Sequence, residues 1–274
     1  MHEAEGRTAL ITGASSGIGA AFARQLAAAG WRLLLVARRQ GVLATLAAEL
    51  QAGHGVQAEA FPADLAAPHD LARLEAYIGS LPRLDLLINN AGFGSSGHLA
   101  ENDPAVAADM VAVHATATAR LCRAALPGML ARGQGSIINT GSIAAFLPVT
   151  GNVLYSASKM FVVRFSQSLA LEVGGQGIRV QALCPGFTLS GFHDTPVFAD
   201  FDRRHIPAFL WNTADEVAAA SLAALQRGRP VVFIPYWKNR LIVFLSSNGV
   251  AAPTVRLVRG LLRRRGRRRQ GAAT

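Results

Sequence analysis

The amino-acid sequence predicts an α/β protein in which a doubly wound parallel sheet is flanked by helices. Three observations support this fold class. Short apolar, β-prone runs alternate with longer alanine- and leucine-rich stretches of helical period. The first such run leads directly into a glycine-rich turn. The chain is also long and apolar enough, with 274 residues of which 51% are hydrophobic, to bury one sizeable core in a single domain.

The alternation predicts seven strands with helices between them, and Gly, Pro or Asp residues mark the ends of these elements. The strands are expected at Thr8–Ile11, Arg32–Val36, Val56–Phe61, Leu84–Ile88, Ser136–Asn139, Ile178–Leu183 and Val231–Ile234. The helices are expected at Ile18–Ala29, Gly41–Gln51, Pro68–Ser80, Pro104–Arg132, Val153–Gly174 and Ala214–Gln226.

Positive charge is concentrated near the C-terminal end of the chain. The formal net charge is +10, but eight arginines lie between residues 256 and 269, where no acidic residue occurs. The rest of the chain therefore carries a net charge of only +2. A nearly neutral body argues against nucleic acid as a partner. We expect one domain over residues 1–240 and an apolar and basic extension over residues 241–274.

The cysteine content and the N-terminal segment bear on the cellular setting. Cys122 and Cys184 are too few for a disulfide framework. The first residues do not combine a charged leader with an apolar core and a cleavage site, and no apolar run reaches the roughly 18 to 20 residues that span a bilayer. We therefore expect a cytoplasmic protein, and the sequence suggests no metal site.

A glycine-rich turn follows the first expected strand. It reads Thr12-Gly13-Ala14-Ser15-Ser16-Gly17-Ile18-Gly19. Glycine allows a tight reversal from strand to helix, the approach of a pyrophosphate to bare backbone and close packing of the helix on the strand. The start of the helix then offers N–H groups and a partial positive charge to phosphates. An ordinary tight turn is the alternative, but the position after the first strand favours a dinucleotide site in a Rossmann-like fold.

Further motifs follow in order along the chain. They are Asn89-Asn90-Ala91-Gly92, Ser142, Tyr155-Ser156-Ala157-Ser158-Lys159 and Pro185-Gly186. With the G-x-x-x-G-x-G spacing of the first turn, they resemble the motifs of the short-chain dehydrogenase/reductase family. The resemblance implies an oxidoreductase that interconverts a carbonyl group, in a ketone or aldehyde, and an alcohol by hydride transfer with a nicotinamide cofactor. It also implies that Tyr155 is the general acid/base, that Lys159 adjusts its pKa and that Ser142 orients the substrate.

The residues themselves agree with these roles. Tyrosine has an unperturbed pKa of about 10 and needs a nearby cation to exchange a proton near neutral pH. Lys159 lies four residues after Tyr155 on an expected helix, so the two share a face. Ser142 is expected just beyond the fifth strand, at the sheet edge where doubly wound folds bind ligands. A sugar-nucleotide epimerase also uses a tyrosine and a lysine, but its larger domain and glycine spacing fit this chain less well.

The end of the second expected strand bears on the choice of cofactor. An NAD site usually has an acidic residue there, whereas the 2′-phosphate of NADP(H) requires cations. Here Ala37 occupies the position of the acid, and Arg38 and Arg39 follow it. A guanidinium can bind the phosphate through charge-assisted hydrogen bonds, so we expect NADP(H). Two solvated arginines at the start of a helix are the alternative.

The resemblance extends the cofactor site to other segments. Asp64 matches the family position beside the adenine, although it could equally cap the following helix. Thr188 and Ser190 match the segment that contacts the nicotinamide carboxamide. The expected cofactor-binding residues are Gly13, Ser15, Ser16, Gly17, Ile18, Gly19, Arg38, Arg39, Asp64, Leu65, Asn90, Ala91, Gly92, Tyr155, Lys159, Pro185, Gly186, Thr188 and Ser190.

His114 departs from the family pattern. The family often has an asparagine in a Val-Asn-x-x-Gly segment, which helps to hold a water molecule in the proton path to the lysine. This chain reads Val113-His114-Ala115-Thr116-Ala117 instead. A histidine can donate or accept a hydrogen bond and so support a water relay, which makes His114 a candidate catalytic residue. The alternatives are a buried histidine without a catalytic role, or an impaired relay in an NADP(H)-binding sensor or scaffold with little turnover.

Residues 187–212 are expected to form a movable lid over the substrate. Its aromatic residues are Phe192, Phe198, Phe201, Phe209 and Trp211. They favour an apolar small-molecule substrate, although packing within the lid explains them equally well. The lid is the variable part of such folds, so the identity of the substrate stays open.

The chain continues beyond the family pattern. Apolar and basic residues alternate there as in an amphipathic helix with a cationic face, which could lie on an anionic membrane surface. The residues concerned are Leu257, Val258, Leu261 and Leu262 with Arg256, Arg259, Arg263, Arg264 and Arg265. A helix packed on the body and followed by a solvated tail is the alternative. Because the extension follows an edge strand that the family often uses to build tetramers, we expect a homo-oligomer, and a dimer rather than a tetramer.

Overall fold

One parallel sheet forms the centre of the protein. The structure is a computed structural model, and it describes residues 6–148, 150–192, 198, 202–228 and 230–247. The strands of the sheet are β1 (Thr8–Thr12), β2 (Arg32–Ala37), β3 (Ala58–Pro62), β4 (Leu86–Asn89), β5 (Gly135–Thr140), β6 (Ile178–Leu183) and β9 (Val232–Phe233). Their order is β3-β2-β1-β4-β5-β6-β9, and every neighbouring pair is parallel. The predicted seven-stranded, Rossmann-like fold is confirmed.

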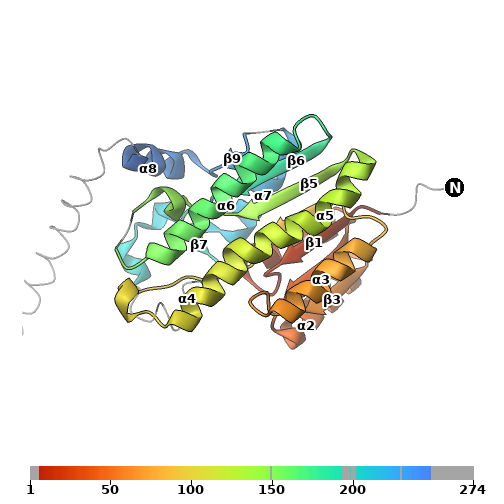
Figure 1. Cartoon of the computed structure of the whole chain (residues 1–274), viewed down its shortest axis with the longest axis horizontal. Coiled ribbons are helices and arrows are strands. Elements are labelled where there is room, and N and C mark those ends of the chain that lie inside the picture. Colours follow the sequence, from red (N-terminus) through yellow and green to blue (C-terminus); the bar gives the residue numbers. More distant parts are fainter. Residues whose placement is uncertain (1–5, 149, 193–197, 199–201, 229, 248–274) are drawn as a thin grey trace, which may run out of the picture.

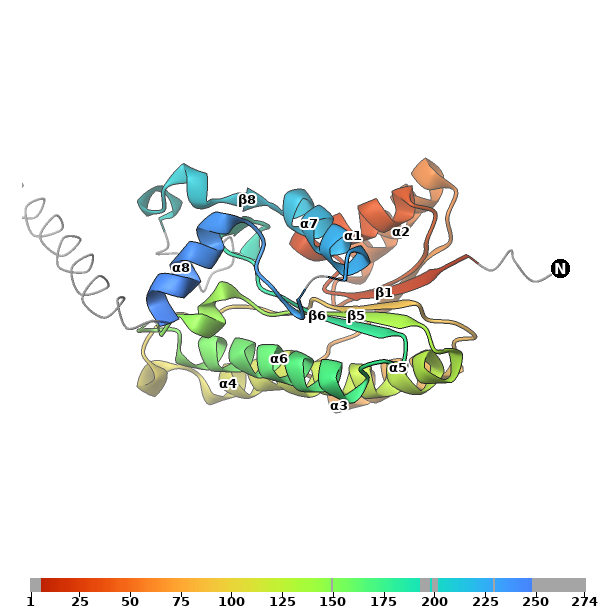
Figure 2. The same ribbon diagram turned by 90° about the horizontal axis from the view of Figure 1, so that it is seen from above.

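Helices cover both faces of this sheet. They are α1 (Gly17–Ala28), α2 (Gln40–His54), α3 (Pro68–Ser80), α4 (Pro104–Val111), α5 (Thr118–Arg132), α6 (Val153–Glu172), α7 (Ala214–Gln226) and α8 (Trp237–Ser247). Short 3-10 segments lie at Leu99–Glu101, Ile143–Phe146, Arg203–His205 and Ala208–Leu210. Figure 1 shows the order of the elements, and Figure 2 shows α1, α2 and α7 on one face and α3, α5 and α6 on the other.

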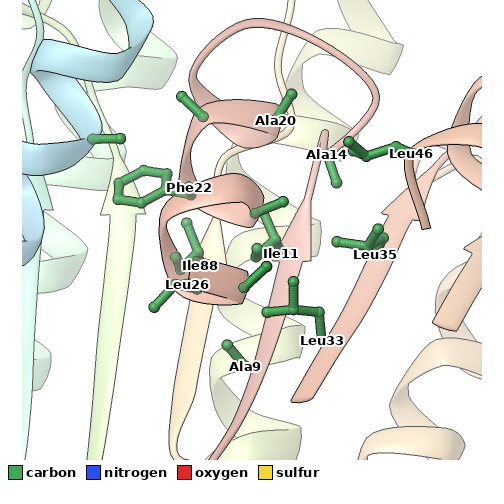
Figure 3. Packing of buried hydrophobic residues seen from close by; sticks show 14 of the residues in the cluster. Ala9, Ile11, Ala14, Ala20, Phe22, Leu26, Leu33, Leu35, Leu46 and Ile88 are labelled. Carbon is green, nitrogen blue, oxygen red and sulfur yellow. The ribbon is translucent and has the colours of Figure 1, made fainter. Parts of the chain in front are cut away.

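Alternate residues of the central strands pack against the two helical layers. In β1, Ile11 belongs to the core beneath α1 and α2, whereas its neighbour Leu10 belongs to the core beneath α3 and α5. Figure 3 shows Phe22 of α1 with Ile11 and Leu35 in the first of these cores. Because the strands are buried on both faces, their sequences are continuous apolar runs, which is the pattern from which they were predicted.

The predicted helix Pro104–Arg132 is interrupted, so this expectation was wrong in its middle part. Residues Ala112–Ala117 form a π-helical segment, η2, between α4 and α5. A π-helical turn is wider than an α-helical turn and often occurs at functional sites. It places His114 in the interior, where the residue is only 1% exposed. The alanine-rich segment contains no Gly or Pro that would have signalled the change.

Two features outside the main sheet were not predicted. β7 (Thr188–Leu189) and β8 (Asn212–Thr213) pair with each other and join the two ends of the expected lid. α8 begins at Trp237, so it crosses the expected boundary between residues 240 and 241. The predicted amphipathic helix of residues 256–265 lies outside the described residues. No helix in the described part of the chain is long and apolar enough to cross a membrane.

The packing of α1 on the sheet leads to a stability prediction. Phe22 is completely buried, so Phe22→Ala should leave a cavity and lower the free energy of unfolding by about 3 to 5 kcal/mol. Urea unfolding followed by circular dichroism measures this change. Leu171 is 85% exposed, and the control Leu171→Ala should stay within about 0.5 kcal/mol of the unchanged protein. A similar loss in both variants would contradict the assigned packing.

Candidate active site

The carboxyl ends of β1 and β4 lie side by side where the strand order changes direction. The chain runs from β1 toward β2 and β3 on one side and from β4 toward β5 and β6 on the other. Such a switch opens the crevice in which doubly wound folds bind ligands. Thr12 ends β1 and Asn89 ends β4, so the glycine-rich turn and the Asn-Asn-Ala-Gly segment meet at this crevice.

Gly13 and Gly19 keep the turn after β1 free of side-chain atoms. A Cβ on Gly13 would lie 2.9 Å from Ala91 Cα, and the φ angle of +66° is itself unfavourable for other residues. A Cβ on Gly19 would collide with the carbonyl oxygen of Gly13. The turn therefore presents bare backbone, which is the surface that a pyrophosphate needs.

Thr12 and Asn90 fix the position of this turn. Thr12 Oγ1 accepts hydrogen bonds of 3.0 Å from the backbone N–H groups of Asn90 and Ala91. In return, Asn90 Nδ2 donates to Thr12 O at 3.1 Å and to Gly13 O at 3.4 Å. The expected residues Asn90 and Ala91 thus hold the turn against β4.

The N-terminus of α1 completes the phosphate cradle. Ser16 precedes the helix but does not cap it through its side chain, so the N–H groups of the first turn, which includes Ile18, require another partner. Gly17 has a φ angle of +55°, and a Cβ there would lie 2.7 Å from Ser190 O. The start of the lid segment therefore packs directly on the turn. Bare backbone and a helix N-terminus fit the diphosphate of a dinucleotide cofactor.

Arg38 and Arg39 follow β2 at the surface. Arg39 Nη2 donates to Ser15 Oγ at 3.0 Å, which places its guanidinium beside the glycine-rich turn. The half-buried Ala37 ends β2 without offering a carboxylate. The two cations and the missing acid suit an additional anionic group at this end of the cradle. Sequence reasoning favoured Arg38, and the structure adds a fixed position for Arg39.

Asp64 and Leu65 follow β3. Asp64 Oδ1 accepts a hydrogen bond of 3.0 Å from the backbone N–H of Ala66, and Asp64 N donates to Asp70 Oδ2 at 2.8 Å. The N-cap residue of α3 is Ala67, so Asp64 stabilises the turn before the helix and does not cap the helix itself. Leu65 is buried in the core.

Ser142, Tyr155 and Lys159 lie together beyond the end of β5. Ser142 begins the short helix η3 (Ile143–Phe146), where its Oγ accepts a hydrogen bond from the backbone N–H of Ala144 at 3.1 Å. Tyr155 and Lys159 are one turn apart on α6, and Lys159 Nζ is 5.8 Å from the centre of the tyrosine ring. Ser142 lies close enough to Tyr155 to lower the pKa of the tyrosine. The three residues form one cluster.

Lys159 places a positive charge inside the protein. The residue is only 5% exposed, and its Nζ donates to Thr140 O at 2.9 Å. Burial lowers the pKa of Lys159 to about 8. The neighbouring Cys184 remains a neutral thiol because burial raises its pKa to about 12. Lys159 is therefore mainly charged at neutral pH and loses its proton a little above it.

Tyr155 retains its proton over the same range. Burial raises the pKa of Tyr155 to about 12, and the nearby Ser142 side chain offsets only part of this shift. Part of the side chain is still open to solvent. Tyr155 is therefore a neutral phenol with a proton to donate.

His114 lies beside Tyr155, with a distance of 5.8 Å between the ring centres. Its Nε2 accepts a hydrogen bond of 3.1 Å from the backbone N–H of Phe93. We therefore assign the ring proton to Nδ1, which lies 2.8 Å from Ser158 Oγ. Ser158 Oγ in turn donates to the carbonyl oxygen of Tyr155 at 2.9 Å. Both ring nitrogens of His114 are thus engaged within the protein.

Burial and a nearby charge keep His114 neutral. Burial, and to a smaller degree the charge of Lys159, lower the pKa of His114 well below 6.5. Gly92 makes room for both side chains, because a Cβ there would lie 2.8 Å from His114 Nε2 and 3.2 Å from Lys159 Nζ. The glycine of the Asn-Asn-Ala-Gly segment is therefore a steric requirement of this site.

Pro185 and Gly186 follow β6 and border the site. Pro185 O accepts a hydrogen bond of 3.0 Å from Ile143 N, which ties this segment to the loop of Ser142. Thr188 Oγ1 donates to Gly186 O at 3.0 Å, and Ser190 Oγ donates to Thr188 O at 3.3 Å. The expected carboxamide-binding segment is thus held next to the predicted catalytic cluster.

Phe192, in the segment expected to form the lid, packs on Tyr155. The ring centre of Phe192 is 5.8 Å from that of Tyr155 and 5.3 Å from that of Phe198. Phe209 is 68% exposed, and Phe201 lies outside the described residues. Packing within the lid and an apolar lining beside Tyr155 are therefore both present.

Several polar residues that support the site were not predicted. Asn139, which is completely buried in β5, accepts a hydrogen bond from Asn89 Nδ2 and donates to Ser166 Oγ, both at 2.9 Å. A polar residue inside an otherwise apolar strand was the available signal for it. The supporting residues that were not predicted to belong to the site are Thr12, Asn139, Thr140, Ser158 and Asn239.

Comparisons with known proteins identify the family of the chain. The short chain dehydrogenase family model matches residues 7–197. A short-chain dehydrogenase from Sphingobium yanoikuyae, solved in complex with NADPH, is 36% identical over 93% of this chain and 95% of its own, with a TM-score of 0.79. A short chain dehydrogenase/reductase from Burkholderia phymatum, solved with NAD, is 28% identical over 89% and 94%, with a TM-score of 0.77. The very-long-chain 3-oxoacyl-CoA reductase of Coprinopsis cinerea is 32% identical over 97% of this chain and 80% of its own.

The fold and the cradle at the switch point are those of a dinucleotide-binding protein. The extent of the family match decides the family. The chain belongs to the short-chain dehydrogenase/reductase family. The two solved neighbours described above were found with NADPH and with NAD.

The buried His114 leads to a prediction about pH. Since its pKa is lowered in the folded state, the unfolded chain binds an extra proton below pH 6.5, and this part of the stability is lost as the pH falls. The free energy of unfolding should therefore decrease from pH 7 to pH 5, by at most about 1.4 kcal/mol per pH unit from this residue. Urea unfolding at several pH values measures the slope.

The variant His114→Asn separates this residue from the other titrating groups. It should be less stable at pH 7, because it loses hydrogen bonds to Phe93 or Ser158, but its stability should fall less steeply toward pH 5. Equal slopes in the variant and the unchanged protein would show that His114 does not titrate in this way.

Proposed function

We propose that the protein is an NADPH-dependent reductase that interconverts a ketone or aldehyde and an alcohol, with Tyr155 as general acid/base. The convergence of Ser142, Tyr155 and Lys159 beside the dinucleotide cradle carries this proposal. When bound, the nicotinamide supplies or accepts the hydride. The protein has to orient the carbonyl group, provide the proton and exclude competing reactions.

Proton transfer to the substrate oxygen is assigned to the hydroxyl of Tyr155. In reduction, the phenol donates its proton to the oxygen of the former carbonyl group and becomes a phenolate. The charge of Lys159 stabilises this phenolate in a site of low polarity. Ser142 is placed to hydrogen-bond the same oxygen and so to orient it. In alcohol oxidation the proton moves in the opposite direction.

His114 acts in this proposal as a positioning residue. Its ring nitrogens are occupied by Phe93 and Ser158, and its low pKa removes it as a proton carrier at neutral pH. Through Ser158 it supports the backbone of Tyr155 on α6. Of the alternatives raised by the sequence, a direct relay through the imidazole is therefore the least consistent with these contacts.

The preference for NADPH over NADH rests on Arg38 and Arg39. Both are exposed just after β2, and Ala37 leaves no carboxylate to bind ribose hydroxyls or to repel a phosphate. Arg39 is already oriented by its hydrogen bond to Ser15. The solved relative from Sphingobium yanoikuyae was found with NADPH, which supports this assignment.

An apolar substrate is proposed from the lid. Phe192 lies against the ring of Tyr155, and Phe198 continues the aromatic surface, so the carbonyl group would enter beside aromatic rings. The curated relative from Coprinopsis cinerea, a very-long-chain 3-oxoacyl-CoA reductase, acts on a long acyl group, as its name states. A ketone or aldehyde with an extended apolar part fits both observations.

The variant Tyr155→Phe tests the reaction. Removal of the proton donor should lower kcat for carbonyl reduction by about 100- to 10,000-fold. It should change NADPH binding much less, because the ring remains. NADPH absorbance with a panel of apolar ketones and aldehydes measures kcat, and cofactor fluorescence measures binding. Unchanged turnover would rule out Tyr155 as the acid, whereas tight NADPH binding without turnover over the whole panel would favour a sensor or scaffold.

The cofactor preference is tested by Arg38→Ala and Arg39→Ala. Each variant should weaken NADPH binding by about ten- to a hundredfold, because a charge-assisted hydrogen bond to the phosphate is lost. NADH binding should hardly change, since NADH lacks that phosphate. The matched control is Arg164→Ala, an exposed arginine on α6. Equal losses for NADH and NADPH, or a preference of the unchanged enzyme for NADH, would contradict the assignment.

The pH dependence of reduction follows from Lys159. Its pKa of about 8 means that the ammonium is lost as the pH rises, so kcat should be steady between pH 6.5 and 7.5 and should fall above about pH 8. A rate that increased steadily up to pH 10 would contradict a role for this charge. Circular dichroism over the same range provides the control for unfolding.

A further inference from the structure

Helix α8 presents an apolar face to solvent. Trp237 is 73% exposed, Leu241 45%, Phe244 64% and Leu245 42%. Leu241, Phe244 and Leu245 follow Trp237 by four, seven and eight positions, so all four residues lie on one side of the helix. Exposed apolar surface of this kind usually marks a place of interaction.

The opposite side of α8 is anchored to the body of the protein. Asn239 is only 1% exposed, its Nδ2 donates to Pro235 O at 2.9 Å, and its side chain fills the space beside Gly186. Lys238 Nζ donates to Trp211 O at 3.3 Å and to Phe209 O, so the helix is also tied to the lid. The apolar face therefore lies on the side of α8 away from Asn239. Figure 2 shows α8 at one end of the molecule.

Positive charge accompanies this apolar face. Lys238 and Arg240 lie on either side of it in the helical projection. The next 27 residues, 248–274, contain eight arginines and no acidic residue, whereas the rest of the chain carries a net charge of only +2. An exposed apolar face joined to a strongly basic segment is characteristic of proteins that bind at the surface of an anionic bilayer.

The same observations count against other partners. A second copy on this face would bring two segments of eight arginines close together, at a cost in charge repulsion. Nucleic acid would pair with the arginines but would leave the face of Trp237 and Phe244 in water. A bilayer with anionic lipids accommodates both features, and indole rings favour the headgroup region.

We propose that α8 and the basic segment that follows it dock the protein on an anionic membrane surface. The face of Trp237, Leu241, Phe244 and Leu245 enters the headgroup boundary, and the arginines of residues 256–269 bind the anionic headgroups. Because Lys238 joins α8 to the lid and Asn239 packs on Gly186, this orientation holds the entrance of the candidate active site next to the bilayer. The docking does not depend on which reaction the site performs.

Vesicle sedimentation with the full chain tests this proposal. The protein should sediment with vesicles of phosphatidylcholine mixed with phosphatidylglycerol, should bind pure phosphatidylcholine vesicles at least tenfold less, and should dissociate as salt is added. The double variant Trp237→Ser/Leu241→Ser should weaken the binding by about tenfold or more, because it removes apolar surface from the contact. Quenching of Trp237 fluorescence by brominated lipid, lost in Trp237→Phe, should locate the face in the bilayer.

The control is Leu171→Ser, which removes an equally apolar and still more exposed residue at the far end of α6 and should leave vesicle binding unchanged. Thermal unfolding confirms that each variant is folded. No binding to anionic vesicles would overturn the proposal. Full binding by the α8 double variant would also overturn it, because the arginines alone would then account for the binding. A change from oligomer to monomer in that variant, with unchanged vesicle binding, would assign the face to a second copy instead.

Discussion

The hydrogen bond from Lys159 Nζ to Thr140 O holds a charged ammonium group inside the protein, since Lys159 is only 5% exposed. Burying a charge is costly. Burial lowers the pKa of Lys159 to about 8, so its ammonium group loses a proton more readily than it would in water. This constraint explains much of the surrounding structure. Gly92 has no side chain because Lys159 and His114 occupy the space, and Tyr155 lies where a phenolate would be stabilised by the charge.

The groups around Lys159 remain neutral at physiological pH. Burial keeps Cys184 and Tyr155 protonated, while burial and the lysine charge keep His114 deprotonated. A single charge therefore acts on Tyr155 without competition from these neighbours. The π-helical segment contributes by placing His114 between Phe93 and Ser158, where it supports the start of α6. These hydrogen bonds join three segments, the loop after β4, η2 and α6, beside the proposed proton donor.

Much of this arrangement could be predicted because it depends on local sequence. The seven strands and the helices between them follow from the alternation of apolar runs and helical stretches. The glycine and serine residues of the turn from Gly13 to Gly19 indicate a phosphate-binding turn. Contacts between distant segments could not be predicted in the same way. Nothing near Asn239 in the sequence indicates that it packs on Gly186, and the alanine-rich surroundings of His114 conceal the π-helical turn. These features depend on tertiary packing, which the local pattern does not encode.

The most direct test of the central claim is the titration of the Lys159 ammonium by NMR. The chain contains two lysines, Lys159 and Lys238, so isotope-labelled lysine gives two sets of signals, and Lys238→Arg assigns them. The account predicts that Lys159 titrates with a midpoint near pH 8 in the folded, full-length protein. A midpoint at the ordinary lysine value of 10.5 would contradict it, because the charge beside Tyr155 would then not be buried.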